Sequence, residues 1–511
     1  MFDPTLHLFV DDYHIRNLFA LQRVYGVPEK HPTPVLSDIP GRVVAWGSVI
    51  HEPGSDGSQR FRLWYQSVCD SSVHEMSSAG LYGRGEEFGF FPERFPQPVR
   101  ESQTSVISYA ESRDGIHWEK PDLGLVEWQD STANNIVLDG AGAARQFDGA
   151  LTNMDTVSVL RDEADPDPQR RYKMICHWET VHVWDNRVST LGRSEGYMKR
   201  IWAARAKYLT TSPDGIHWEA PLVRIKECAG GGDYAGVTRD ERNKRYWFSD
   251  RAPIGLSGIR YRSAAFCTSP DLYHWPETVE MAFAPGVYED YGKRYEHHGM
   301  VPFNYGDQDL CFLEYSITGR PVAGVLGSHR DGERWRLVNG NHHFLPLGPT
   351  GAFDSEIVAM TRNAPVRSGD RLLFFYNGRA SASYDPLVQI EGKGYLGVAT
   401  LRLDGFAGLT VDELAERRHQ LPAMLLTQPI TVQRNELLIN LADHHGTAKV
   451  ALLDLAAQPI PGYELENCLP LAEGVRVPVR WQEQATVSAL AGQPVLVLVQ
   501  MQAGTLYALC L

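Results

Sequence analysis

The chain has 511 residues, a formal net charge of −14 and no run rich in Lys or Arg. Nucleic acids and anionic membranes require a basic surface, so neither is expected as the main partner. Seven scattered cysteines without a Cys-x-x-Cys pair predict packed, reduced thiols and no cysteine-based zinc site. The first residues lack a signal-peptide pattern and no window approaches the ~20 apolar residues of a membrane span, so we expect a cytoplasmic protein.

A short phrase recurs along the chain, first as SRDGIHWE and then as SPDGIHWE. Its copies, the later ones weaker, lie at residues 112–119, 212–219, 269–275, 328–335 and 403–406. In an Asp-Gly turn the Asp side chain accepts hydrogen bonds from nearby backbone N–H groups, and Gly takes positive φ. Because function rarely repeats five times, we interpret the phrase, with its Trp and His, as a structural turn.

The repeats are spaced about 60–100 residues apart, which suits a four-stranded propeller blade with loops. Each copy follows a strand rich in aromatic and branched residues. These strands lie at 61–65, 172–175, 246–248, 310–313 and 372–376. The sequence therefore predicts an all-β fold, a five-bladed β-propeller over residues 40–408. The apolar segment 8–10 could close the ring of blades, which would bring Asp11 or Asp12 to the centre.

After the repeats the pattern of the sequence changes. Residues 410–420 have helical character, with Thr410 and Glu413 as a capping box, so we expect a linker helix. Short strands separated by turn residues follow and predict a C-terminal β-sandwich. The expected domains are residues 1–408 (propeller, N-terminal strand included), 409–424 (linker helix) and 425–511 (β-sandwich).

An equal spacing singles out three acidic residues at the starts of first strands. Each stands six residues before an arginine: Asp155 before Arg161, Asp233 before Arg239, and Glu356 before Arg362. The fourth blade offers Glu296 in this region, and the first blade offers Trp46. Since first strands line the central channel of a propeller, we expect these acids to converge there.

Converging carboxyl groups are what cleavage of a glycosidic bond needs, one to protonate the leaving oxygen and one to attack or to activate water. The candidates for these two roles are Asp155, Asp233, Glu296 and Glu356. The alternative for each acid is a structural role, in which it bonds backbone N–H groups or pairs with an Arg.

Further side chains are candidates for substrate binding. They are Trp46, His51, Trp64, His177, Arg294, His297, His298 and Asp354. Adjacent strand residues point to opposite faces, so only one of His297 and His298 is expected to face the channel. Trp64 has interblade packing as its alternative, and Arg294 a salt bridge to Glu289 or Asp290. We expect no metal and no cofactor.

With its Asp-turn-Trp phrases, five-fold count and trailing sandwich, the chain resembles the five-bladed propeller glycosidase superfamily of invertases, levanases, arabinanases and mannosyl-glycan phosphorylases. It is most similar to proteins described as like the glycosyl hydrolase family 32 N-terminal domain. The resemblance implies an Asp nucleophile or base, a helper Asp and a Glu acid. By position, Asp155 is then the expected base or nucleophile, Asp233 the expected group that orients the substrate and tunes pKa values, and Glu296 or Glu356 the expected proton donor. The invertase motif Trp-x-Asn-Asp-Pro-Asn-Gly is absent, so sucrose and levan are not expected substrates.

The expected function is therefore a glycoside hydrolase that removes terminal sugars from oligosaccharides or glycosides. A phosphorylase, in which Arg294 and His297 or His298 hold phosphate, is the second hypothesis, and a carbohydrate-binding propeller without catalysis is the third. A sialidase is disfavoured, because its repeats place one residue between Asp and Gly. The sequence is also compatible with a homo-oligomer.

Overall fold

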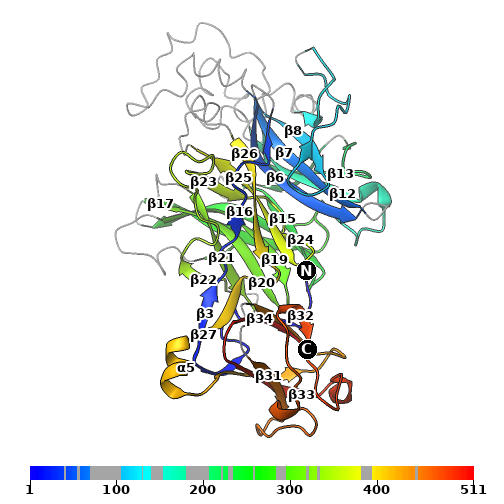
Figure 1. Ribbon diagram of the computed structural model, residues 1–511. Helices are drawn as coiled ribbons and strands as arrows, with labels where there is room; N and C mark the ends of the chain where they lie inside the picture. Colours follow the sequence, from blue (N-terminus) through cyan, green and yellow to red (C-terminus); the bar gives the residue numbers. More distant parts are fainter. Residues whose placement is uncertain are drawn as a thin grey trace.

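The computed structural model describes residues 1–38, 42–53, 58–69, 105–128, 130–139, 153–179, 206–219, 222–227, 234–256, 259–283, 295–317, 322–330, 334–380, 394–442 and 447–511. Regular structure in these ranges is almost entirely β-strand, which confirms the all-β prediction (Figure 1). The described residues form one α-helix, α5 (Glu413–His419), and 3-10 turns at Pro168–Arg170, Leu465–Asn467 and Ser488–Leu490. None of the helices in these ranges has the length and apolar character that a membrane span needs.

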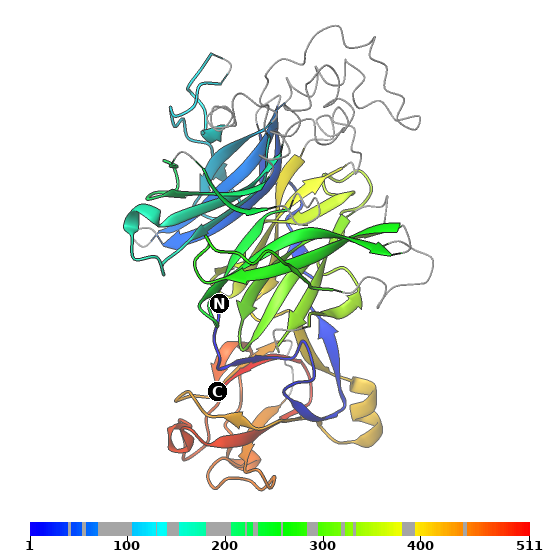
Figure 2. The same cartoon turned by 180° about the vertical axis from the view of Figure 1, so that it is seen from behind.

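Five groups of antiparallel strands follow one another between residues 42 and 402, in the upper part of Figures 1 and 2. Group 1 contains β6 (Arg42–Pro53), β7 (Gln59–Cys69), β8 (Ser105–Ser112), β9 (Trp118–Glu119) and β10 (Ile136–Asp139). Group 2 contains β11 (Asn153–Arg161), β12 (Tyr172–Glu179), β13 (Ala206–Ser212) and β14 (Val223–Glu227). Group 3 contains β15 (Gly236–Asp240), β16 (Arg245–Leu256), β17 (Ile259–Ser269) and β18 (Glu280–Met281).

Group 4 contains β19 (Tyr295–Tyr305), β20 (Gln308–Ile317), β21 (Val322–His329) and β22 (Arg336–Asn341). Group 5 contains β23 (Ile357–Met360), β24 (Val366–Ser368), β25 (Arg371–Arg379) and β26 (Gly394–Arg402). A parallel contact between β21 and β23 joins these two groups into one sheet. Two N-terminal strands, β4 (Glu29–Lys30) and β5 (Leu36–Ser37), pair with β26 at its outer edge.

Five hydrophobic clusters hold neighbouring groups together, and one of them joins group 5 to group 1. Representative pairs are Trp64 with Met174, Leu209 with Phe248, Trp247 with Leu313, Phe312 with Phe374, and Leu63 with Phe375. Successive strand residues point to opposite faces, so neighbours such as Phe312 and Leu313 enter different clusters. Aromatic runs in the second strands therefore fill both faces of each group.

The first three copies of the recurring phrase form the turn that the sequence predicts. Asp114 Oδ1 accepts hydrogen bonds from the backbone N–H groups of Ile116 and His117, each at 2.8 Å, and Oδ2 lies 2.7 Å from His117 Nδ1. Gly115 takes φ 77°, and the copies around Asp214 and Asp271 repeat the same contacts. The Asp and His of these copies are thus satisfied within the turn.

Residues 331–333 of the fourth copy lie outside the described residues. The fifth copy differs from the prediction, because Asp404 itself takes positive φ (64°) and its side chain accepts a hydrogen bond from Tyr305.

The C-terminal strands lie in two sheets, in the lower part of Figure 1. One sheet runs β3 (Leu21–Tyr25), β27 (Ala407–Val411), β34 (Thr505–Cys510), β30 (Leu438–Ala442) and β32 (Gly474–Pro478), with β1 (Leu6–Leu8) also on β34. The other runs β2 (Ile15–Phe19), β28 (Ala423–Thr427), β33 (Pro494–Met501) and β29 (Ile430–Thr431), with β31 (Ala448–Leu453) also on β33. Buried side chains of both sheets, including Leu409 and Val497, share one core.

The N-terminal segment differs from expectation. Segment 8–10 does not close a ring of strand groups, since β1 pairs with β34, and residues 29–37 instead supply the edge strands of group 5. The sequence-based division assigns residues 1–408 to one domain, whereas β1, β2 and β3 hydrogen-bond to C-terminal strands. The domain boundaries therefore stay a prediction.

Helix α5 lies inside the expected linker, but its cap differs. Thr410 belongs to β27, and the N-cap is Asp412, whose side chain accepts hydrogen bonds from the backbone N–H groups of Leu414 and Ala415. An Asp at the N-cap accepts hydrogen bonds from two of the backbone N–H groups that have no partner within the helix. The predicted capping box of Thr410 and Glu413 is therefore wrong.

Candidate functional site

The first strands of groups 1, 2 and 4 share an irregularity near their beginnings. Strand pairing shifts between Val44 and Gly47 in β6, between Asp155 and Val157 in β11, and between His297 and Gly299 in β19. The extra residue in β11 is Thr156, which takes φ 43°, a costly conformation for a β-branched side chain. Bulges re-aim side chains and are common beside active sites. Trp46, Asp155 and His298 all lie at these bulges.

Arg362 lies where the five strand groups meet. Its backbone N–H donates to Gly47 O at 2.8 Å, and its backbone O accepts from Ser158 Oγ at 3.4 Å. Its guanidinium carbon is 3.9 Å from the centre of the Tyr234 ring, and Nη1 forms an ion pair with Glu314. With 1% exposure, this residue of group 5 touches groups 1 and 2, the residues that lead into group 3, and group 4.

A second cationic side chain, Arg379, lies near the point where the strand groups meet. The guanidinium carbon of Arg379 lies 4.8 Å from the Trp46 ring, and that of Arg362 lies 5.8 Å from it. Trp46 is half-buried, so its ring keeps some exposure while two cations approach it. The indole is therefore held in place at the start of group 1.

A fully buried ion pair links groups 2 and 3. Lys207 Nζ lies 3.3 Å from Asp250 Oδ1 and donates to the backbone oxygen of Tyr234 at 2.5 Å. Both charged side chains have 0% exposure. Because an unpaired charge at such a depth is very costly, the two residues depend on each other.

The structure describes some of the predicted acidic residues and not others. Asp155 lies in β11 opposite His177, directly before the bulge, and its side chain is outside the described residues. Asp233 lies wholly outside them. Glu296 is buried in β19, and Glu356 is half-buried, with its backbone N–H donating to Arg379 O at 3.0 Å. When β11 and β19 are aligned by their bulges, Asp155 corresponds to His297, and Glu296 stands one residue earlier.

The two neighbouring histidines of β19 have different surroundings. His297 is buried between the rings of Phe283 and Tyr315, and burial lowers its pKa to about 4. It is therefore neutral at pH 7. His298 is half-buried at the bulge, with Nε2 3.1 Å from Ser316 Oγ. Arg294, the predicted neighbour of this pair, lies outside the described residues.

The other proposed binding residues are spread over the fold. His177 is fully buried in β12 beside the bulge of β11. Trp64 is fully buried between groups 1 and 2, and its indole N–H donates to Gly215 O at 2.6 Å, which is the packing role given as its alternative. His51 stacks on Phe61 five residues beyond Trp46, about 16 Å further along the strand.

Asp354 and the two N-terminal acids have ionic partners away from the bulges. Asp354 is buried, pairs with Lys30 Nζ at 2.6 Å and accepts a hydrogen bond from Tyr376. Asp11 pairs with Arg330 at 2.9 Å, close to the turn at the far end of β19. Asp12 pairs with Arg23. The alternative in which Asp11 or Asp12 reaches the centre is therefore wrong.

The arginines that marked the spacing of six are not equivalent in space. Arg161 is exposed, Arg239 is half-buried and Arg362 is buried. Moreover, β11 contains an extra residue at Thr156, whereas the pairing of β15 is regular over Gly236–Asp240. The three arginines therefore do not share one environment, and the common position of the preceding acids stays a prediction.

Glu314 was not among the residues predicted from the sequence, and Arg362 served there only to define the six-residue spacing from Glu356. Glu314 lies in an apolar second strand, between Leu313 and Tyr315, and is 4% exposed. A charged residue inside such a strand signals a buried ion pair, because an isolated charge there would be too costly. That signal was available for Glu314, and for Asp250 in β16 as well.

No protein-family model and no curated protein matches this sequence. The structural neighbours are propeller glycosidases and glycoside phosphorylases, at low sequence identity. An exo-β-1,3-galactanase from Clostridium thermocellum is 10% identical, with a TM-score of 0.42 over 94% of this chain and 87% of its own. The β-1,2-mannobiose phosphorylase of Listeria innocua is 15% identical, with a TM-score of 0.39 over 76% and 98%.

A third neighbour is named for a different reaction. The N-acetylgalactosamine deacetylase from F. plautii is 12% identical, with a TM-score of 0.46 over 76% of this chain and 97% of its own. The neighbours thus include glycosidases and phosphorylases of the kind that the resemblance in sequence named. At these TM-scores the roles of individual residues rest on the geometry of this chain alone.

Proposed function

We propose that this chain is a glycoside hydrolase in which strand groups 1 to 5 are the blades of a five-bladed propeller. The observation that carries the proposal is the position of Arg362, which contacts residues of groups 1, 2 and 4 and Tyr234, which leads into group 3. The hydrophobic cluster between groups 5 and 1 supports the same circular order. The axis of the propeller then passes close to Arg362, and the active site lies beside it.

The catalytic residues belong at the end of the blades that carries the bulges. Asp155 serves as base or nucleophile, because it stands directly before the bulge of β11. Glu296 serves as proton donor from the equivalent end of β19, with Glu356 as the other candidate. Asp233, which orients the substrate, completes the set. Two carboxyl groups placed on either side of a glycosidic bond suffice for its hydrolysis.

Neutral groups at the same end suit a sugar. His297 is neutral at pH 7, since burial lowers its pKa to about 4, so it can exchange hydrogen bonds with a hydroxyl group. The half-buried Trp46, whose ring lies near the guanidinium groups of Arg362 and Arg379, offers a flat face for the apolar side of a pyranose ring. These residues would bind the terminal sugar of an oligosaccharide or glycoside.

The test is a screen of nitrophenyl glycosides and short oligosaccharides with and without inorganic phosphate. We expect hydrolysis of at least one substrate, at a rate that phosphate does not change. Activity that requires phosphate and yields a sugar phosphate would instead establish a phosphorylase. Saturable sugar binding without any turnover would contradict an enzyme and favour a carbohydrate-binding propeller.

A further inference from the structure

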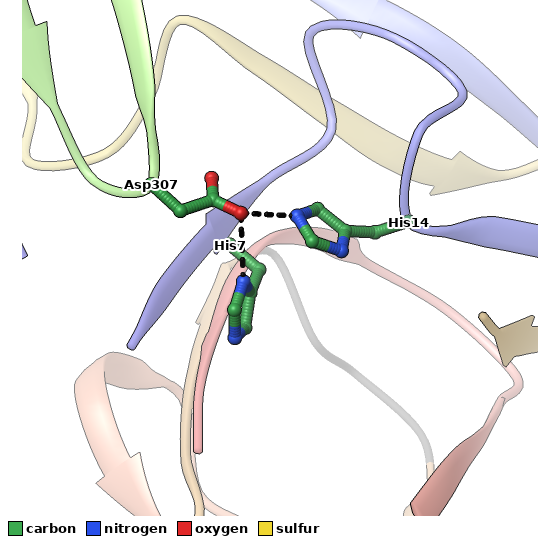
Figure 3. Close-up of side chains that lie close together, drawn as sticks. All are labelled: His7, His14 and Asp307. Carbon is green, nitrogen blue, oxygen red and sulfur yellow. Dashed lines mark hydrogen bonds and ion pairs between the residues drawn. The ribbon is translucent and has the colours of Figure 1, made fainter. Parts of the chain in front are cut away.

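Two histidines and an aspartate from distant parts of the chain converge beyond the end of β19 (Figure 3). His7 lies in β1, His14 directly precedes β2, and Asp307 lies in the turn between β19 and β20. Asp307 Oδ2 is 3.1 Å from His7 Nδ1 and 2.5 Å from His14 Nε2. In the described part of the chain, no other three His, Cys, Asp or Glu side chains come together in this way.

The spacing suits a bound cation. Nitrogen and oxygen ligands lie about 2.0–2.2 Å from a transition metal, so neighbouring ligand atoms are about 3–3.5 Å apart. The separation of His7 Nδ1 from Asp307 Oδ2 already lies in this range. The contact of His14 with the same oxygen would need to open by less than about 1 Å. The present hydrogen bonds thus hold the three side chains close to a coordinating arrangement.

Both histidines are buried, and the carboxylate of Asp307 is partly buried, with a side-chain exposure of 14%. His7 and His14 are each 6% exposed. The set therefore supplies two imidazole nitrogens and one carboxylate oxygen, the donor types that transition metals bind.

Arg330 orients the carboxylate from behind. Its Nη1 lies 3.0 Å from Asp307 Oδ1, the oxygen that faces away from the histidines. Its own charge is balanced by Asp11, whose carboxylate is 2.9 Å from Arg330 Nε. Carboxylate ligands of metals are commonly fixed by such outer partners. Asp307 Oδ2 is thus left to point toward His7 and His14, as Figure 3 shows.

The three side chains open onto a pocket of about 450 Å³. Its other lining residues are Tyr13, Gln428, Pro429, Ile430, Thr431 and Gln433. Three protein ligands with an open position are typical of metal sites that also bind water or a small molecule, whereas closed structural zinc sites have four. The Gln428 N–H donates to His14 O at 2.9 Å and fixes the edge of the pocket next to the histidine.

We propose that His7, His14 and Asp307 bind one divalent transition-metal ion, with an open coordination position toward this pocket. Imidazole nitrogen favours zinc, cobalt, nickel or ferrous iron, whereas calcium and magnesium prefer oxygen ligands alone. The site joins the N-terminal segment to group 4. It lies at the end of β19 opposite Glu296, so it is independent of the proposed hydrolase site.

For the test, bound metal is removed from the full chain with EDTA, and the EDTA is then removed. Co²⁺ is titrated into the protein while visible absorption and the heat of binding are measured. We expect one equivalent to bind and to be displaced by Zn²⁺ but not by Mg²⁺. Binding should weaken by at least about 100-fold in His14→Gln and Asp307→Asn, and stay unchanged in His342→Gln, which alters an exposed histidine elsewhere. Circular dichroism verifies that each variant is folded.

Absence of a stoichiometric Co²⁺ site in the folded wild-type chain would overturn the proposal, and so would equal binding by His14→Gln. If a variant does not fold, the melting temperature of the wild type decides. It should rise when one equivalent of Zn²⁺ replaces EDTA, and the same rise should occur in His342→Gln. No rise in the wild type would contradict the site.

Discussion

Arg362 Nη1 and Glu314 Oε1 form an ion pair between group 5 and group 4, with side-chain exposures of 1% and 5%. Arg362 also donates through Nη1 to Met360 O at 3.0 Å. The pair lies where the strand groups converge, so its loss should affect the whole arrangement and not one sheet alone.

Replacement of Arg362 by Met should lower the free energy of unfolding by about 3–5 kcal/mol, because Glu314 would remain buried without its partner. Urea denaturation measures the loss. The double variant Arg362→Met with Glu314→Gln removes the uncompensated charge and should recover part of the stability. A double variant less stable than the single one would contradict this account of the pair.

Gly299 should not tolerate a side chain. A Cβ atom there would stand 1.9 Å from Cε2 of Tyr234, whose ring also packs on Arg362. We expect Gly299→Ala to cost at least about 1–3 kcal/mol by displacing this ring. Gly324→Ala is the matched control, since its Cβ would meet Leu345 no closer than 3.5 Å. Equal melting temperatures for the two variants would argue against close packing of Tyr234 on the bulge.

Much of the fold could be predicted from sequence because its signal is local. The turn around Asp114 carries its own hydrogen-bond partners within a few residues, so a short phrase identifies it. Strands such as Arg371–Arg379 are recognisable from aromatic and apolar content alone. The repeat of both signals is what predicted five similar units.

The centre was less predictable, because it depends on contacts between distant residues. Nothing local to Tyr234 or Glu314 indicates that Arg362 lies against both. The bulge at Thr156 changes the position of Asp155 relative to Arg161, and spacing in sequence cannot reveal it. The pairing of β1 with β34 likewise joins the two ends of the chain, which no local pattern anticipates.

The cysteines should resist thiol reagents in the folded protein. Cys176, Cys267 and Cys510 are buried, and burial raises the pKa of each thiol to about 12, so almost no thiolate is present at pH 8. Cys311 and Cys468 are buried as well. Peptide mapping after treatment with iodoacetamide should find these five unmodified, and modified after unfolding in urea. Rapid labelling of Cys176 in the native state would contradict its burial.

The repeated turns should make the protein sensitive to acid. Partial burial of Asp114 and Asp214 acts against ionisation, but hydrogen bonds from the following His and from backbone N–H groups outweigh it, so each folded pKa lies below the 3.8 of the free group. The same holds for Asp271. Because the folded pKa is depressed, the stability gained is complete above about pH 4–5 and is lost as the pH falls further.

The triple variant Asp114→Asn, Asp214→Asn and Asp271→Asn tests this origin of acid sensitivity. It should be less stable than the wild type at pH 7, and the difference should shrink between pH 4 and pH 2, because Asn does not titrate. Urea midpoints at several pH values measure the difference. A difference that stays constant over this range would show that the turns do not contribute through ionised carboxylates.

The most direct test of the proposed hydrolase is the rate of sugar release by Asp155→Asn, compared with the wild type on the best substrate of the glycoside screen. Removal of a catalytic carboxylate should lower kcat by at least about 10³-fold with the melting temperature unchanged. Glu163→Gln, which alters an exposed acid beside Arg161, should keep the wild-type rate. A wild-type rate in Asp155→Asn, or no hydrolysis by the wild type of any glycoside, would contradict a carboxylate site at the bulged end of the strand groups.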